Sequence, residues 1–418
     1  MIYSGLTAEQ NILLHLLRRN LCPSEADEAL PKELCESADW NEVFLESVRQ
    51  AVPIMAFDRA AEFREYIPEE VFQRWLMTAG NVFQTNERVA HAQKELVELL
   101  EKNGYPYLIL KGLSAASYYP NPEFRGLGDV DFLVEADKTK EVGKLLVKNG
   151  CKKWGCAHGH HVAYQRSDAH LELHFEVAGI PYGEAGERVR AFLKGALQSG
   201  KKVQLQTGGF VAPNETYHGL ILLLHMQHHM LGEGLGLRHL CDWACFVERT
   251  VSEPFWEETL IPFIKEIGLF TYAAVMTKTC ALYLGTPCPD WAAEADEQVC
   301  AEVLDDIFKG GNFGGKDIKR AKSAMLISER GKGGTNHSKA YNLCHGFHAY
   351  TRAKHPSCQK CFLLYPVFYV IEGFRYLGLM IAGKRHSPLS MAADADERKA
   401  VYDKLHVFEK EEKQREEK

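Results

Sequence analysis

The sequence predicts an α+β fold, in which a short mixed sheet with its helices is flanked by N-terminal and C-terminal helical regions. Three observations lead to this prediction. Strand-like runs alternate with helical segments between residues 104 and 206. Before and after this stretch the apolar residues recur mainly with helical spacing. Apolar residues make up 46% of the chain and charged residues 25%, as in a globular protein rather than a disordered or fibrous one.

Charge and cysteine content narrow the class of protein further. The 418 residues include 49 Lys and Arg against 56 Asp and Glu, a formal net charge of −7. This balance argues against extensive non-specific nucleic-acid binding, which needs many cationic contacts to phosphate. The 12 cysteines are mostly single or inside apolar segments, which does not suggest a disulfide framework. The first eleven residues lack the cationic start of a signal peptide, so we expect a cytoplasmic protein.

One apolar stretch, residues 361–382, is a candidate for a membrane-spanning segment. It contains Pro366, Glu372 and Arg375, whereas a spanning helix consists of about 20 apolar residues with few or no charges. We therefore expect no membrane span, and we interpret this stretch as a buried or amphipathic helix pair.

Local patterns give the order of the elements. Thr7 is a candidate helix N-cap, because Gln10 stands three residues later as in a capping box. Further helices are expected over residues 40–56, 71–76 and 86–102, the last of which stops at Asn103 and Gly104. In the sheet region, strands are expected over 105–110, 129–134, 162–165 and 170–177, with a helix over 137–149.

From residue 215 onward the pattern returns to helix. The expected segments are 215–231, 238–250, 254–284 and 294–309, followed by less regular helices over 320–382. The expected domains are an N-terminal helical region over 1–103, a core over 104–210 and a C-terminal helical domain over 211–390. A charged tail follows over 391–418, and we interpret it as a solvated or frayed helix.

The chemistry of the chain centres on Asp129 and Asp131, which stand at alternate positions of an expected strand. Because side chains alternate along a strand, the two carboxylates share one face, and Val130 and Phe132 share the other. Adjacent carboxylates raise each other's proton affinity, and a bound divalent cation would offset this repulsion. Mg²⁺ prefers such ligands together with waters and phosphates. A solvated strand edge is the alternative interpretation of an Asp-x-Asp pair.

A third acid, Glu172, alternates with Leu171 and Leu173 in the same way, 41 residues after Asp131. This interval accommodates a helix and a hairpin, which would bring the two strands side by side. Three carboxylates on adjacent strands would form a two-metal site for phosphoryl transfer. Upstream, Gly112 and Ser114 follow a strand and could open a helix, whose backbone amides could receive phosphate oxygens.

Together these residues resemble the nucleotidyltransferase superfold of polymerase-β-like enzymes, which pairs a Gly-Ser turn with an Asp-x-Asp strand and a later acid. The chain is most similar to the bacterial family of uncharacterised nucleotidyltransferases, over about residues 5–380. The matching pieces are Leu110-Lys111-Gly112, Arg125, Asp129-Val130-Asp131, Glu172-Leu173-His174, His225 and the stretch 237–242. In the superfold Ser directly follows Gly, whereas here Leu113 intervenes, so Lys111 or the Gly112 amide could replace Ser114.

The resemblance implies roles for these residues. Asp129, Asp131 and Glu172 would hold two Mg²⁺ ions, with Mn²⁺ as an alternative, and Glu172 could accept a proton from the acceptor. The implied phosphate-binding residues are Lys111, Gly112, Ser114, Arg125 and Arg238. The acceptor oxygen would attack the α-phosphate in line and release pyrophosphate.

Other side chains could contact the substrate. His174 shares the face of Glu172, and His161 precedes the neighbouring strand. Asp242 follows Arg238 by four residues on an expected helix, a spacing that is equally typical of a simple ion pair. Two zinc hypotheses rest on incomplete ligand patterns. They concern His225, His228 and His229 on one helix, and Cys344, Cys358 and Cys361 further along.

The function expected from the sequence is therefore Mg²⁺-dependent transfer of a nucleoside monophosphate (NMP) from a nucleoside triphosphate (NTP). The acceptor bears a hydroxyl group and is a small molecule, a protein or an RNA. Two alternatives stay open: a catalytically inactive nucleotide-sensing or protein-interaction module, and a toxin-like enzyme that modifies tRNA or protein. A basic face formed by Lys309, Lys316, Lys319, Arg320 and Lys322 would favour tRNA.

Overall fold

The computed structural model describes residues 2–22, 29–154, 159–167, 169–327, 338–355, 357–382, 387 and 391–409. Its N-terminal elements are α1 (Ala8–Leu21), α2 (Lys32–Ser37), α3 (Trp40–Arg49), α4 (Pro53–Ala60), the 3₁₀ segment η2 (Ala61–Tyr66) and α5 (Glu69–Lys102). The predicted capping box of α1 is confirmed, because Gln10 N–H donates to the Thr7 hydroxyl and Thr7 N–H to the Gln10 side chain. The two helices predicted over 71–102 are one continuous helix, since α5 runs through Gly80.

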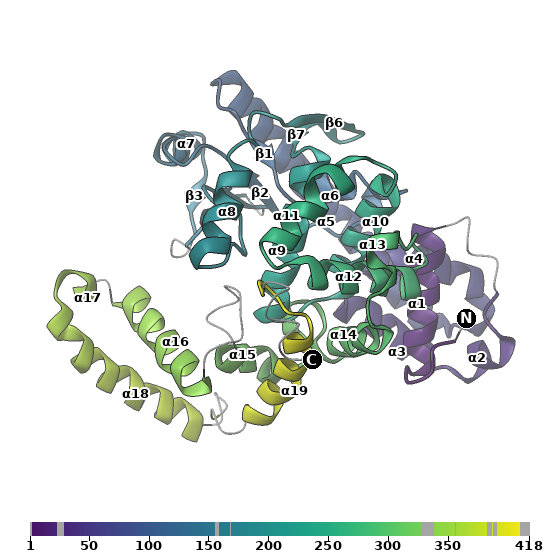
Figure 1. The fold of residues 1–418 in the computed structure, drawn as a ribbon. Helices are drawn as coiled ribbons and strands as arrows, with labels where there is room; N and C mark the ends of the chain where they lie inside the picture. The colour runs from purple at the N-terminus through teal and green to yellow at the C-terminus, as the bar shows by residue number, and fades with distance from the viewer. Residues whose placement is uncertain are drawn as a thin grey trace.

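A five-stranded mixed sheet forms the centre of the middle region (Figure 1). Its strands are β1 (Leu108–Ile109), β2 (Asp129–Leu133), β3 (Lys152–Lys153), β4 (His161–Arg166) and β5 (Ala169–His174), in the order β1-β2-β5-β4-β3. β2 and β5 are parallel, and the other pairs are antiparallel. Between β2 and β5 the chain forms α7 (Thr139–Lys148) and the β3–β4 hairpin, as the interval predicts. The α+β prediction is confirmed.

The sheet buries one face against the C-terminal half of α5. Val130 and Phe132 of β2 share an apolar core with Val89, Leu96 and Leu100 of that helix. The opposite face of β2 therefore stays available for its aspartates. A second hairpin, β6 (Lys201–Leu205) and β7 (Gly208–Ala212), extends this core and was not anticipated from the sequence. Between β5 and β6 lies α8 (Gly183–Leu193).

A larger core joins the N-terminal helices to the helices that follow residue 214. These are α9 (Glu215–Leu231), α10 (Leu237–Thr250), η4 (Trp256–Leu260), α11 (Ile261–Glu266), α12 (Phe270–Leu284), α13 (Asp290–Ala293) and α14 (Glu297–Gly310). The single helix predicted over 254–284 is wrong, because Gly268, at φ +72°, separates α11 from α12. The domain boundaries at 103 and 210 stay a proposal, and the packing of α5 on the sheet shows that the N-terminal region contributes to the core.

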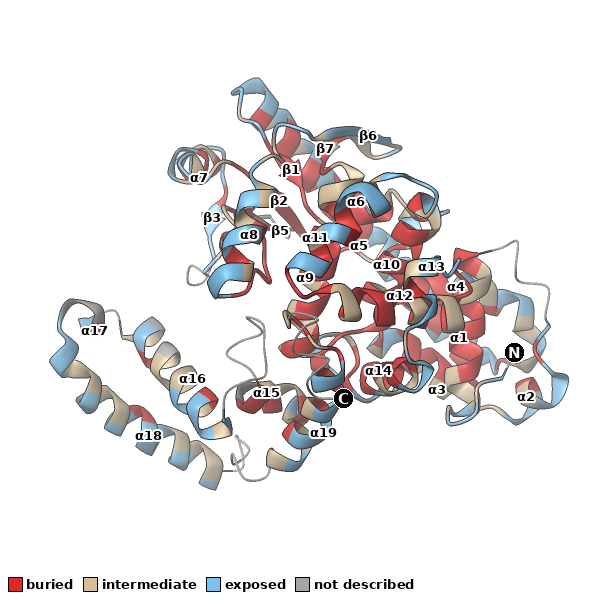
Figure 2. Ribbon diagram, viewed as in Figure 1, coloured by how far each residue is buried: buried red, intermediate tan, exposed pale blue. Residues whose placement is uncertain are grey.

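Beyond α14 the chain forms the short turn η5 (Asn312–Gly314), α15 (Ile318–Ile327) and α16 (Lys339–Lys354), then α17 (Ser357–Lys360), η6 (Phe362–Leu364), α18 (Tyr365–Ile381) and α19 (Ala392–Lys404). Figure 1 shows α16 and α18 side by side, away from the sheet. Of the two interpretations of 361–382, the buried one is wrong, because α18 is mostly exposed or half-buried (Figure 2) and Glu372 is its one buried residue, whereas the amphipathic one stays open. Among the described residues, Phe362–Ile381 is the one segment long and apolar enough to cross a membrane.

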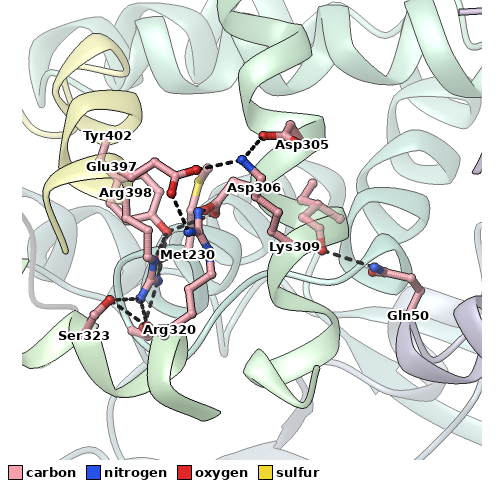
Figure 3. Close-up of polar contacts among 12 residues, drawn as sticks. Gln50, Met230, Asp305, Asp306, Lys309, Arg320, Ser323, Glu397, Arg398 and Tyr402 are labelled. Atoms are coloured by element: carbon pink, nitrogen blue, oxygen red, sulfur yellow. Dashed lines mark hydrogen bonds and ion pairs between the residues drawn. The ribbon is translucent and has the colours of Figure 1, made fainter. Parts of the chain in front are cut away.

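Helix α19 is held against the body by a buried arginine (Figure 3). Arg398, 1% exposed, donates hydrogen bonds to the carbonyl groups of Arg320 (2.9 Å), Met230 (3.0 Å) and Gly232 (3.1 Å). The Tyr402 hydroxyl accepts from Arg398 and donates to Asp306. The interpretation of the tail as a solvated helix is thus wrong for 392–404, and residues 410–418 lie outside the described part of the chain.

We predict that Arg398→Ala lowers the free energy of unfolding by about 2–4 kcal/mol, because three buried carbonyl groups lose their donor. Urea unfolding followed by circular dichroism measures this change. Lys399→Ala on the same helix removes an exposed contact to Asp403 and should cost less than about 0.5 kcal/mol. Equal unfolding midpoints for the two variants would contradict the packing role of α19.

Candidate active site

The parallel pairing of β2 with β5 brings the three predicted acids together. In the register of these strands Asp131 lies opposite Glu172, and Asp129 lies opposite His170. Asp129 and Glu172 line an open cleft of about 480 Å³, whereas Asp131 is only 2% exposed beside it. The complete lining is Gly128, Asp129, Trp154, His161, Ala163, His170, Glu172, Arg238 and Phe313. Two elements far apart in the chain thus face each other across the cleft, the sheet on one side and the start of α10 on the other.

Asp131 is held by two cationic or proton-donating groups. Its Oδ1 lies 2.8 Å from Lys111 Nζ and 2.8 Å from His174 Nε2. Burial by itself would raise the pKa of Asp131, but Lys111 and His174 outweigh it and hold that pKa well below the usual value. Burial likewise acts to lower the pKa of His174, yet its hydrogen bonds to Asp131 and Glu172 raise it. Asp131 is therefore ionised and fixed in orientation.

Asp129 has no hydrogen-bond or ion-pair partner for its carboxylate within the described residues. The charge of Asp131, followed by burial, raises the pKa of Asp129 to about 6. Lys111 and Arg238 offset this repulsion only in part, and a divalent cation would relieve the rest. Ligand atoms of Asp131, Glu172 and His174 also lie within 4.8 Å of one another. This group contains two carboxylates, whose oxygens are donors that Mg²⁺ or Mn²⁺ prefer, so it fits such an ion, whereas Asp129 is not among the members of this group.

The turn before the site is built on Gly112, at φ +62°. A side chain there would be strained, and its Cβ would approach the Asp129 carbonyl to 3.6 Å. Helix α6 (Leu113–Ala116) begins at this turn but has four residues, so its dipole is small. The expected phosphate contact of Ser114 is wrong for this arrangement, because Ser114 is fully buried and its hydroxyl does not reach the cleft.

Arg125 forms a buried bidentate ion pair with Asp242 of α10. The Nε and Nη2 atoms of Arg125 lie 2.8 and 2.7 Å from the two carboxylate oxygens, and the Tyr119 hydroxyl donates to the same group at 2.7 Å. Because both side chains are buried and paired with each other, the structure gives no support to the predicted phosphate role of Arg125 or to the predicted substrate contact of Asp242. The alternative ion pair between Arg238 and Asp242 is wrong, since Asp242 pairs with Arg125 instead.

Arg238, near the start of α10, lines the same cleft as Asp129 and Glu172. Its guanidinium group lies 5.4 Å from the centre of the Phe313 ring and donates to the Gly126 carbonyl at 3.4 Å. Its Nε atom has no partner among the described residues. Burial, followed by the charge of Arg125, lowers the pKa of Arg238. A cation without a carboxylate partner at this position can receive an anion from the cleft.

Behind Arg238 lies a histidine cluster that the sequence reasoning captured only in part. Ligand atoms of His225, His229 and His239 lie within 4.8 Å of one another. His239 stands beside Arg238 in the sequence but was not included with the other two, which lie on the preceding helix. The Gly236 N–H donates to Nδ1 of His239 at 3.4 Å, so Nε2 carries the proton and is a buried donor without a partner. That tautomer suits an anion better than a metal ion.

The remaining candidates have these positions. His161 Nε2 lies 3.5 Å from Glu172 Oε1, and His174 Nε2 lies 3.4 Å from Glu172 Oε2, so both histidines adjoin the acid. A third group that could hold a metal consists of His160, His161 and His174. The candidate groups found in the described residues do not include Cys344, Cys358 or Cys361, and Cys344 and Cys361 are exposed.

A family model described as an uncharacterised nucleotidyltransferase matches residues 36–285, more than half of the chain. The matched range contains the sheet, all three acids and α10. No curated protein matches the sequence.

We predict that Asp242→Ala lowers the free energy of unfolding by about 3–5 kcal/mol, because it leaves the buried Arg125 without a counter-charge. Arg125→Ala should cost a similar amount, and the double variant should cost clearly less than the sum. Urea unfolding of all four proteins completes this cycle. Strict additivity would show that the two side chains do not act as a pair.

Proposed function

The chain belongs to the family of uncharacterised nucleotidyltransferases, and from this premise we propose that it transfers an NMP from an NTP to a hydroxyl-bearing acceptor with release of pyrophosphate. The observation that carries the proposal is the meeting of Asp129, Asp131 and Glu172 on adjacent strands beside a cleft, with Arg238 on the facing side. One side of the cleft thus suits metal ions, and the other suits the phosphates that bind them.

The acids would hold Mg²⁺, or Mn²⁺ in its place. When bound, such an ion neutralises phosphate charge and favours ionisation of the acceptor hydroxyl. Lys111 and His174 keep Asp131 ionised and in place, as their 2.8 Å contacts support. We assign the phosphates to Arg238, Lys111 and the backbone amide of Gly112.

In the proposed reaction the acceptor oxygen forms a bond to the α-phosphorus. The bond from that phosphorus to the bridging oxygen breaks, and pyrophosphate leaves. Glu172, which is one-quarter exposed at the cleft, accepts the proton of the acceptor. Alignment of these groups and stabilisation of charge supply most of the rate enhancement.

The structure does not favour a tRNA acceptor on the basis suggested by the sequence. Four of the five cations expected to form a basic face have acidic partners. Lys309 pairs with Asp305 and Glu397, Lys316 with Glu46, Lys319 with Asp394, and Arg320 with Asp306. The acceptor therefore stays open between a small molecule and a macromolecule. We further propose a cytoplasmic location, which the eleven free thiols of the described chain support.

We predict that the protein transfers label from an α-³²P-labelled NTP to a component of a cell extract when Mg²⁺ or Mn²⁺ is present. Asp129→Asn, Asp131→Asn and Glu172→Gln should each lower the rate by about 10²-fold or more, because each removes a charge that stabilises the reacting phosphates. Asp137→Asn, an exposed acid just beyond β2, is the matched control and should keep full activity.

The same assay separates the enzyme from an inactive module. NTP binding by calorimetry without label transfer to any component would favour a nucleotide-sensing module. Full activity in Asp129→Asn would remove the basis of the proposal.

We predict that Arg238→Met weakens NTP binding by about tenfold or more, because a charged hydrogen bond to phosphate is lost. Titration calorimetry with each NTP and Mg²⁺ measures the dissociation constant. Arg249→Met, an exposed arginine at the other end of α10, is the control and should bind NTP as the unchanged protein does. Unaltered binding by Arg238→Met would exclude the phosphate role.

A further inference from the structure

The pair of helices α16 and α18, here called the helical hairpin, exposes an apolar stripe. Six residues of η6 and α18 recur at alternating intervals of four and three, which places them on one helix face. They are Leu363, Val367, Val370, Phe374, Leu377 and Ile381, and each is between 47% and 80% exposed. With Phe362 and Ile371 they make up eight of the nineteen large apolar side chains exposed in the described residues. An exposed apolar surface of this density marks a binding surface.

The other face of α18 already packs against α16. Glu372, 4% exposed, accepts hydrogen bonds from Lys354 at 2.7 Å and from His355 at 3.0 Å. The rings of His355 and Phe368 stack at a centroid distance of 4.0 Å. The hairpin is therefore a formed unit, and the apolar stripe faces away from its internal contacts.

The charge of the hairpin indicates what covers this stripe. The described residues 338–355 and 357–382 contain five Lys and Arg and a single acid, Glu372, a formal charge of +4 in a chain of net charge −7. Two of these cations have acidic partners, Lys339 with Asp396 and Lys354 with Glu372. Glu372 is buried on the side of α18 that faces α16, and it is paired with Lys354 and His355. The cations include Arg352, which is exposed on α16, and Arg375, whose side chain is 58% exposed. The surface thus combines exposed apolar side chains with a net positive charge.

We propose that the helical hairpin docks on an anionic lipid bilayer, with the apolar stripe of α18 at the boundary between headgroups and acyl chains. Amphipathic helices with cationic flanks bind membranes in this way, and anionic lipids add about 1 kcal/mol for each nearby Lys or Arg. The hairpin lies on the bilayer rather than across it, because Glu372, Arg375 and the polar helix α16 would otherwise enter the hydrocarbon.

Other occupants fit the surface less well. A second copy of the chain would bring two hairpins of charge +4 together, and the acid described in each of them, Glu372, is buried and already paired. A nucleic acid would satisfy the cations but would leave the apolar stripe against a polar, charged ligand. The bilayer is the partner that satisfies both properties at once. This inference is independent of the proposed nucleotidyl transfer.

Flotation of the full-length protein with lipid vesicles tests the proposal. Vesicles of pure phosphatidylcholine are compared with an equimolar mixture of phosphatidylcholine and phosphatidylglycerol. We expect flotation with the anionic vesicles, weak flotation with the neutral ones, and release by high salt. Val370→Glu/Phe374→Glu should reduce anionic binding by about tenfold or more, since it places two charges in the stripe. Leu76→Glu/Met77→Glu, at exposed apolar positions of α5, is the matched control and should bind normally.

Several outcomes would overturn the proposal. They are absence of flotation, equal binding to both vesicle types, and retention on the membrane after alkaline extraction, which would indicate a spanning helix. A dimer in analytical ultracentrifugation that Val370→Glu/Phe374→Glu abolishes, without any vesicle binding, would assign the stripe to a second copy. A shift of bulk tRNA in gels without vesicle binding would assign the cations to RNA. Circular dichroism of each variant verifies that the exposed substitutions leave the fold intact.

Discussion

The parallel pairing of β2 with β5 is the constraint on which the site depends. It places Asp131 directly opposite Glu172 and sets Asp129 one pleat further along the same face. The cost is a concentration of negative charge on one face of two interior strands of the sheet. Lys111 and His174 offset part of it at Asp131, whereas Asp129 is left with a pKa raised to about 6. The folded sheet therefore carries an excess of negative charge, which a divalent cation bound together with a phosphate substrate would offset.

The facing side of the cleft has the opposite electrostatic character. Burial and neighbouring cations lower the pKa of Arg238, and burial and like-charged neighbours lower the pKa values of His225, His229 and His239 well below their usual range. The lowered pKa values favour the neutral form of the three histidines, so Arg238 is the cation of this group. Arg238 is the member of this group that lines the cleft, and an anion there would offset its charge.

The sequence was sufficient to predict those parts of the fold and of the site that depend on local, periodic patterns. Alternation of side chains placed Asp129 and Asp131 on one face, and the 41-residue interval correctly anticipated the helix and hairpin that bring Glu172 alongside. Pairings between distant segments left no such signal. Arg125 and Asp242 are 117 residues apart, and nothing in either neighbourhood indicates that they meet. Apolar content also failed to separate a core helix from a surface helix, because α18 is as apolar as a buried one.

The Arg125–Asp242 pair has a mechanical consequence. It links the loop that leads into β2 to the helix that carries Arg238, with Tyr119 as a third point of attachment. Spreading the two sides at this point would expose a guanidinium and a carboxylate that are otherwise sheltered from water. The pair therefore resists separation of the loop from α10. Trp154 and Phe313 also line the cleft, but they are exposed side chains outside this buried contact.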